Sequence, residues 1–165
     1  MNYSLLSKRY NVRKMNTNDV PLILSLCANN VLYYQYYPPF VTKESIVRDL
    51  SALPPNKDES DKFYLSYFEG DRLIAVIDLV LAYPNEQTAF IGFFMCDTNV
   101  QNKGIGSFII DELSSYLKTI GIMNIRLAFV KDNPQASHFW NKNNFQQIKI
   151  VEQNGISLVV AERKL

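Results

Sequence analysis

Gln101-Asn102-Lys103-Gly104-Ile105-Gly106 separates an apolar run that reads as a buried strand from a run that reads as an amphipathic helix. The strand is predicted over residues 89–96 and the helix over residues 105–117. The first N–H groups of a helix have no partner within it, and the helix dipole adds partial positive charge there, so anions bind at such ends. The stretch therefore predicts a phosphate-binding loop.

The two glycines of this loop narrow the choice of ligand. A residue without Cβ lets a phosphate approach the main chain and permits φ values that other residues resist, and Lys103 adds a cation. A dinucleotide fingerprint would have a third glycine and an acidic residue about 20 positions later, and a nucleotide P-loop would end in Gly-Lys-Ser/Thr. Neither pattern is present, so a different phosphate ligand is expected.

A second block lies downstream, where a predicted strand at residues 126–130 precedes Asn133-Pro134-Gln135-Ala136-Ser137-His138-Phe139-Trp140 and then Asn144-Phe145. The two blocks together resemble the GNAT family of N-acetyltransferases. Its signature Gln/Arg-x-x-Gly-x-Gly/Ala is matched by Gln101, Gly104 and Gly106, and its second segment is Asn-x-x-Ala-x-x-Phe-Tyr-x-x-x-Gly-Phe. The resemblance implies that the chain is an acyltransferase and that the phosphate ligand is the pyrophosphate of acetyl-CoA.

The resemblance also implies the rest of the cofactor site. Main-chain groups at the end of the strand over residues 89–96 would bond the pantetheine arm as an added strand would, and Asn133 would cap its helix and bond the cofactor. The residues expected to contact acetyl-CoA are Phe94, Met95, Cys96, Gln101, Asn102, Lys103, Gly104, Ile105, Gly106, Ser107, Asn133 and Trp140.

Trp140 is the main departure from the family pattern. It occupies the place where many members carry a tyrosine that protonates the departing thiolate, and an indole N–H cannot usefully give up a proton near neutral pH. Asn144 stands where the family has glycine, and asparagine is the next best residue for a left-handed helix ending. The usual acid is therefore expected to be missing, while the local backbone is expected to be kept.

Two features supply candidate catalytic side chains. Asp78 interrupts an apolar strand, so it would orient a substrate amine, act as a base, or face outward as an ordinary strand residue; if buried, it needs a partner. Residues 33–40, Tyr-Tyr-Gln-Tyr-Tyr-Pro-Pro-Phe, are predicted as an aromatic loop that either folds onto the sheet edge or lines the acceptor site. The candidates are Asp78, Tyr33, Tyr34, Tyr36 and Tyr37.

Composition excludes several other functions. The chain of 165 residues fits one domain over residues 1–165, and 17 basic against 16 acidic residues are spread evenly, so no nucleic-acid partner is expected. No apolar run of about 18 residues and no secretion signal is visible, which favours a cytoplasmic protein without a membrane partner. Cys27 and Cys96 read as buried free thiols, and a lone His138 gives no metal site.

The order of apolar patterns and turn residues along the chain predicts a mixed α/β fold. Strands are expected at residues 10–15, 63–68, 73–81, 89–96, 126–130, 145–152 and 156–162, with Asn154-Gly155 as a hairpin turn. About four helices are expected, with Thr17 capping the first and Thr42 the second. The GNAT resemblance implies a twisted mixed sheet of six to seven strands whose fourth and fifth strands splay apart.

The leading hypothesis is an acetyl-CoA-dependent N-acetyltransferase in which a primary amine of a small molecule or peptide attacks the thioester directly. The alternative, motivated by Trp140, is a catalytically weak acyl-CoA-binding protein that uses the aromatic loop to bind a ligand or partner. A third hypothesis is the transfer of a longer acyl group, which requires a larger pocket beside Cys96. The chain is expected to be a monomer or a homodimer.

Overall fold

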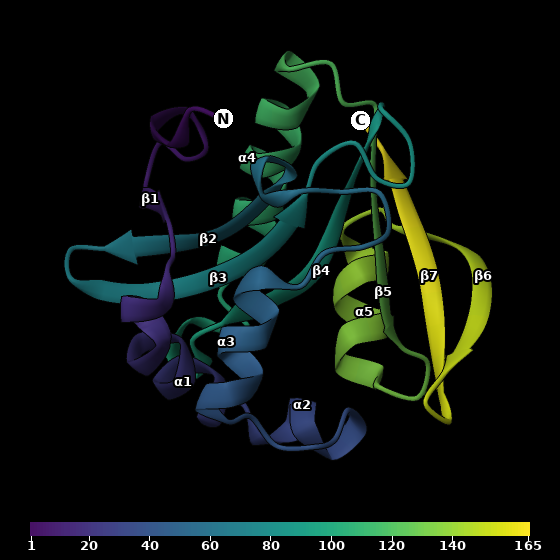
Figure 1. Cartoon of the computed structure of the whole chain (residues 1–165), viewed down its shortest axis with the longest axis horizontal. Coiled ribbons are helices and arrows are strands. Elements are labelled where there is room, and N and C mark those ends of the chain that lie inside the picture. The colour runs from purple at the N-terminus through teal and green to yellow at the C-terminus, as the bar shows by residue number, and fades with distance from the viewer.

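The computed structural model describes residues 1–165 and contains one seven-stranded sheet in the order β1-β2-β3-β4-β5-β7-β6 (Figure 1). β4 and β5 pair in parallel, and all other neighbouring strands pair in antiparallel fashion. The mixed α/β fold is therefore confirmed. The strands are β1 (Asn11–Lys14), β2 (Lys62–Glu69), β3 (Arg72–Val80), β4 (Thr88–Cys96), β5 (Asn124–Val130), β6 (Gln146–Gln153) and β7 (Ile156–Lys164).

The structure has five α-helices, one more than the sequence predicts. They are α1 (Val20–Ala28), α2 (Val31–Tyr36), α3 (Lys43–Ser51), α4 (Ile105–Thr119) and α5 (Pro134–Lys142). The addition is α2, which contains the first half of the tyrosine stretch at residues 33–40, and the prediction of a loop is wrong for that half. No Gly or Pro interrupts residues 31–36, and the prolines that suggested a loop come only after the helix has ended.

The helices cover both faces of the sheet. α4 and α5 contribute Ile109, Ile110, Leu113 and Trp140 to the larger core, which also contains Leu65 and Ile77 of the sheet. α1 and α3 contribute Ile23, Leu26 and Ile46 to a second core on the opposite face, with Tyr64, Val76 and Met95. The alternation of β3 residues between the two cores follows from the two-residue period of a strand.

Local capping matches the sequence with one exception. Thr42 caps α3 through a capping box with Ser45, as predicted. Thr17 is not a cap; Asn16 caps a short 3-10 segment (Thr17–Asp19) that leads into α1. This correction arises because Asn16 and Asp19 reciprocally bond each other's main chain. Asn144 has the expected left-handed conformation, with φ of 64°.

β4 and β5 part halfway along their length. Their ladder joins Thr88–Ile91 to Asn124–Leu127 and then stops, although β4 continues to Cys96 and β5 to Val130. Beyond that point β4 stays paired with β3, and β5 stays paired with β7. Figure 1 shows the two strands diverging toward the lower part of the view. The splay that the family resemblance implies is confirmed, and it leaves one edge of β4 without a strand partner.

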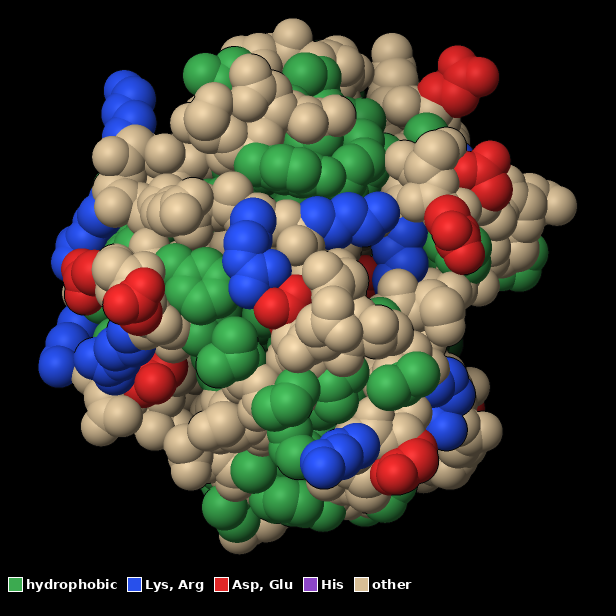
Figure 2. All heavy atoms as spheres, turned by 60° about the vertical axis from the view of Figure 1, so that its left-hand side comes forward, with side chains coloured by type: hydrophobic (Ala, Val, Ile, Leu, Met, Phe, Trp, Pro, Cys, Tyr) green, Lys and Arg blue, Asp and Glu red, His purple; other side chains and the backbone are tan.

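The face shown in Figure 2 carries Lys and Arg side chains interspersed with Asp and Glu, without a continuous basic stripe. This matches the even spread of charge along the sequence. None of the helices combines the length and the apolar character needed to cross a membrane.

Candidate active site

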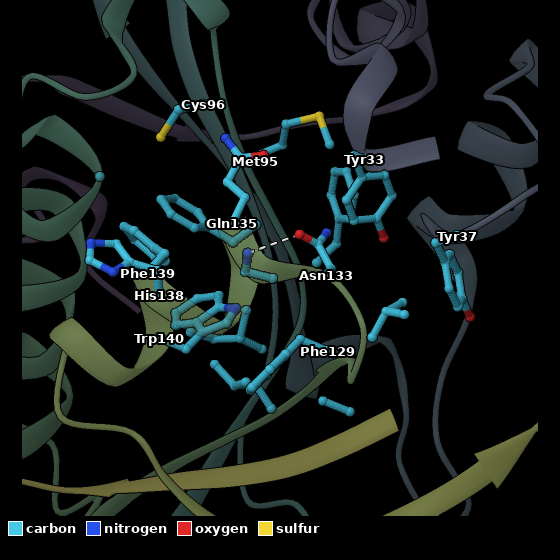
Figure 3. Close-up of a pocket in the computed structure, with 18 of the residues that line it drawn as sticks. Tyr33, Tyr37, Met95, Cys96, Phe129, Asn133, Gln135, His138, Phe139 and Trp140 are labelled. Carbon is cyan, nitrogen blue, oxygen red and sulfur yellow. Dashed lines mark hydrogen bonds between the residues drawn. The ribbon is translucent and has the colours of Figure 1, made fainter. Parts of the chain in front are cut away.

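The gap between β4 and β5 opens into a cleft of about 580 Å³ (Figure 3). Its walls come from the splayed halves of β4 and β5, from the loop after β4 with the start of α4, from α5, and from α2. A volume of this size is ordinary for a site that takes a small-molecule ligand. The cleft brings the phosphate-binding loop and the tyrosine segment, which are far apart in sequence, into one site.

The loop before α4 has the geometry of an anion site. Gly104 precedes α4 in the left-handed conformation, with φ of 78°, and nothing lies within 4 Å of the position where a Cβ would stand. The N–H of Phe108 makes the first bond of the helix, to the Gly104 carbonyl, so the three preceding N–H groups lack helical partners. Asn102, Gly104 and Ser107 line the cleft, while Lys103 and Ile105 do not.

The missing side chain of Gly106 also makes room for a packing contact. A Cβ on this residue would lie 3.0 Å from Cε2 of Phe139 and 3.5 Å from Sγ of Cys96. The missing side chain therefore lets the first turn of α4 pack against α5. Gly106 itself lines the cleft, so the expected contact of its main chain with the cofactor stays a prediction, while the Phe139 ring occupies the space that a side chain would fill.

A chain of side-chain amides fixes the phosphate-binding loop in place. Gln101 Nε2 donates to Asn30 Oδ1 at 2.6 Å and to the Cys96 carbonyl at 3.1 Å. Asn30 Nδ2 donates to the Leu26 carbonyl at 2.9 Å and to the Cys96 carbonyl at 3.2 Å. Gln135 Nε2 of α5 donates to Gln101 Oε1 at 3.2 Å. Asn30 thus connects the end of α1 to the end of β4 and to the loop.

Asn30→Ala is expected to lower the free energy of unfolding by about 1–3 kcal/mol, because the side chain is 8% exposed and its loss leaves buried polar groups without partners. Urea unfolding measures the loss. Asn141 is the matched control, since its only side-chain bond, to Ser137, is exposed; Asn141→Ala should stay within about 0.5 kcal/mol of the wild type. Equal losses in the two variants would contradict the structural importance of the amide chain.

The splayed end of β4 presents main chain to the cleft while its side chains pack elsewhere. The Phe94 ring stacks on Phe139 with centroids 5.6 Å apart, and Met95 belongs to the second core. Burial, with a smaller contribution from the charge of Asp97, raises the pKa of the Cys96 thiol to about 12. Cys96 is therefore a poor nucleophile at neutral pH. What this segment offers a ligand is a backbone edge without a strand partner, on which the Cys96 carbonyl is already bonded to Asn30 and Gln101.

α5 closes the opposite side of the cleft. Asn133 caps the helix by accepting from the Ala136 N–H at 3.1 Å, as predicted (Figure 3). Trp140 lines the cleft but is only 7% exposed, with ring centroids 4.8 Å from Phe139 and 5.0 Å from Phe145. The indole is thus part of an aromatic wall and brings no acidic hydroxyl.

The four tyrosines do not share one environment. Tyr33 and Tyr37 line the cleft, whereas Tyr34 and Tyr36 do not. Tyr33 packs edge-on against Phe93 of β4 with centroids 5.7 Å apart, and burial raises its pKa well above the ordinary value. Tyr34 packs against Phe40 with ring centroids 4.8 Å apart, and burial raises the pKa of its phenol well above the ordinary value. Only Tyr33 and Tyr37 are therefore placed to meet a ligand.

Asp78 is not among the residues that line the cleft. Lys62 Nζ, at the start of β2, donates to both of its carboxylate oxygens at 2.7 and 2.8 Å. The sequence requires a partner for a buried carboxylate at this position but does not identify it. The register of the β2–β3 hairpin would have identified Lys62 as the partner of Asp78. It places Tyr64 opposite Asp78, and Lys62 lies two residues from Tyr64 on the same face of the sheet. Sequence reasoning also missed Asn30, which belongs to no interpreted motif, and Gln135, which stands at an unspecified position of the second block.

In this site a parallel strand pair splays beside a helix N-terminus, β4 has an open backbone edge, and an anion-binding helix end lies beside it. This combination defines an acyl-CoA-dependent transferase. Residues 30–145 match the Acetyltransferase (GNAT) family. The chain belongs to this family, and it is an acyltransferase whose cofactor is acetyl-CoA. A comparison with curated proteins gives no match.

Solved structures of acetyltransferases share the fold. An acetyltransferase from Thermus thermophilus is 21% identical, with 94% of this chain and 97% of that one covered and a TM-score of 0.76. The PaiA N-acetyltransferase of Thermoplasma acidophilum, solved with coenzyme A, is 18% identical over 94% and 99% of the two chains, with a TM-score of 0.70. An acetyl transferase from Salmonella typhimurium that modifies the N-terminal serine of a ribosomal protein is 16% identical over 97% of each chain, with a TM-score of 0.74.

Proposed function

We propose that the protein transfers an acetyl group from acetyl-CoA to a primary amine of a small molecule or peptide, by direct attack of the amine on the thioester. The observation that carries the proposal is the position of the β4–β5 splay. The ladder stops at Ile91 and Leu127, and the cleft that opens there is lined both by the phosphate-binding loop and by Tyr33 and Tyr37. Cofactor and acceptor can therefore meet in the gap.

The residues of the cleft fit the cofactor by their chemistry. Helix N–H groups beside Gly104 would hold the pyrophosphate, and Asn102 and Ser107 lie next to them. The free edge of β4 over residues 92–96 would bond the amide-containing arm, as a strand accepts a further strand. Acetyl-CoA supplies the activated carbonyl. The protein supplies orientation, backbone donors for the developing negative charge, and a route for the proton.

The acceptor end of the cleft is aromatic. Tyr33 of α2 and Tyr37 directly after it line the cleft together with Phe90 and Phe93 of β4 and Phe129 of β5, and no Asp or Glu is among the lining residues. This wall therefore offers no carboxylate that could pair with a polycationic amine. The lining supports an acceptor that presents an apolar group beside its amine.

Trp140→Tyr places a hydroxyl on α5 where the family commonly has one. We expect the affinity for acetyl-CoA to change little, because the aromatic wall is kept, and we expect turnover to rise or its pH profile to move. Calorimetric titration with acetyl-CoA and the pH dependence of kcat measure the two properties. Trp140→Phe is the matched control, since it keeps a ring and adds no hydroxyl. Identical pH profiles for the Tyr and Phe variants would contradict a missing acid at this position.

A catalytically weak acyl-CoA-binding protein is the second candidate, and the burial of Trp140 in place of an acid is the observation that favours it. Binding and turnover separate the two candidates. Acetyl-CoA should raise the melting temperature under both, whereas release of free thiol on addition of amines is expected only of the transferase. An amine panel that includes arylalkyl amines, polyamines and short peptides makes the comparison.

A further inference from the structure

β4 carries an extra residue at the point where it leaves β5. Asp78 of β3 lies opposite Phe93 and Leu79 lies opposite Ile91, so Gly92 has no partner on β3. The last β4–β5 pair joins Ile91 to Leu127. The bulge therefore lies at the opening of the gap, and Gly92 is exposed there as part of the cleft wall.

The carboxylate of Asp78 explains why this residue is a glycine. A Cβ at position 92 would lie 3.0 Å from Oδ2 of Asp78 and 3.5 Å from its Cγ, which is too close for a normal contact. Gly92 is not among the residues with positive φ, so its backbone does not itself require glycine. Glycine at this position leaves the carboxylate directly behind a thin part of the cleft wall.

Lys62 holds that carboxylate in place. The ammonium bonds both oxygens, and the side chains of Lys62 and Asp78 are only 4% and 13% exposed. A buried ion pair contributes little net stability, because the loss of hydration offsets much of the attraction. Apolar residues of similar volume would serve the core as well. The pair thus has no evident structural advantage at this position.

The surroundings favour proton transfer at Asp78. Burial raises the pKa of its carboxyl, Lys62 opposes that rise, and the charge of Asp49 on α3 adds to it. The neighbouring Tyr34 and Tyr64 phenols and the Cys27 thiol have raised pKa values and stay neutral near pH 7. Asp49, Lys62 and Asp78 together carry one net negative charge, next to a cleft whose lining contains no carboxylate.

We propose that Asp78 receives the proton of the acceptor amine past Gly92, where no side chain separates the cleft from the carboxylate, and that Lys62 is the positioning residue that keeps Asp78 ionised and directed there. The inference rests on the proposed function. As the amine nitrogen bonds to the acetyl carbon, the C–S bond breaks and its electron pair leaves on sulfur. The proton lost by the nitrogen passes to Oδ2 of Asp78, so charge and atoms balance.

Activity measurements test the first half of the proposal. Asp78→Asn should lower kcat/KM about 100-fold, the usual contribution of a general base, while the thermal shift caused by acetyl-CoA stays as in the wild type. Gly92→Ala should lower kcat/KM in the same direction, because its methyl group displaces the carboxylate. The double variant Lys62→Met with Asp78→Asn removes both charges, so it should fold and show the same activity loss as Asp78→Asn.

Titration tests the role of Lys62 without acetyl-CoA. NMR of the Asp78 carboxyl carbon should show that Lys62→Met raises its pKa by about one unit or more, because a cation that favours the ionised form is gone. The rising limb of kcat/KM with pH should move upward by the same amount, and Lys62→Arg should restore both. Lys57→Met is the matched control: Lys57 pairs with Asp61 at 2.8 Å outside the cleft, so this variant should change neither property.

The outcomes separate this inference from the proposed function. If the wild type acetylates an amine and Asp78→Asn keeps its kcat/KM within about twofold, the assignment of Asp78 fails and the function stands. If Lys62→Met leaves the Asp78 titration unchanged, the assignment of Lys62 fails whatever the activity. If the wild type binds acetyl-CoA and acetylates none of the amines, the proposed function fails, and the proton-transfer assignment fails with it.

Discussion

Gly104→Asp is expected to abolish the stabilisation of the protein by acetyl-CoA. At a concentration 100 times the Kd, a ligand stabilises the folded state by about 2.7 kcal/mol. For a domain of this size, that corresponds to a rise in melting temperature of about 5–10 °C. The added carboxylate would lie at the start of α4, where unpaired N–H groups attract anions, and it would repel a pyrophosphate. Thermal unfolding with and without acetyl-CoA measures the effect.

Gly121→Asp is the control for backbone strain in this experiment. Gly121 follows α4 at its other end with φ of 88°, close to the 78° of Gly104, and no atom lies within 4 Å of either Cβ position. Both variants carry a left-handed non-glycine residue, which costs about 1–2 kcal/mol. Only Gly104→Asp should lose the response to acetyl-CoA. If both variants respond as the wild type does, the pyrophosphate binds elsewhere.

A second large effect is expected from the two tyrosines of the cleft. The double variant Tyr33→Phe with Tyr37→Phe should lower kcat at least tenfold without raising KM, which corresponds to a loss of about 1.4 kcal/mol or more in the transition state. Each change removes a hydroxyl and keeps the ring, so the packing of Tyr33 on Phe93 is preserved. Steady-state kinetics on the best amine of the panel give both constants.

Tyr34→Phe and Tyr36→Phe are the matched controls, because these tyrosines lie on α2 with Tyr33 and do not line the cleft. They should keep kcat close to the wild-type value. A fall in kcat in the controls equal to that in the double variant would point to a general effect on α2. Full activity in the double variant would leave solvent as the source of the proton for the departing thiolate.

The sequence predicts most of the fold because clear turn residues separate its strands. The Glu69-Gly70-Asp71 and Asn154-Gly155 turns join strands with clear apolar patterns, and all seven strands form close to their predicted positions. α2 was missed because six residues rich in aromatic side chains carry no helical periodicity of their own. Contacts of Tyr33 with Phe93 and of Tyr34 with Phe40 hold this segment, and such contacts depend on the tertiary structure.

The site was predicted in part. Local motifs place the phosphate-binding loop and the capping of α5 by Asn133, because both depend on residues close in sequence. The Asn30–Gln101 contact joins residues 71 positions apart, and no local pattern reports it. The displacement of Asp78 behind Gly92 depends on a bulge between β3 and β4. Long-range register and packing decide these features, and a single sequence does not specify them.

The most direct test of direct acetyl transfer is mass spectrometry of the protein and of the products after incubation with acetyl-CoA, first alone and then with the best amine of the panel. Direct transfer predicts an unmodified protein in both samples, and equal amounts of free coenzyme A and N-acetylated amine in the second. An acetylated Cys96 formed before the amine is added would contradict direct attack. Tight binding of acetyl-CoA with no acetylated product from any amine would contradict the transferase itself.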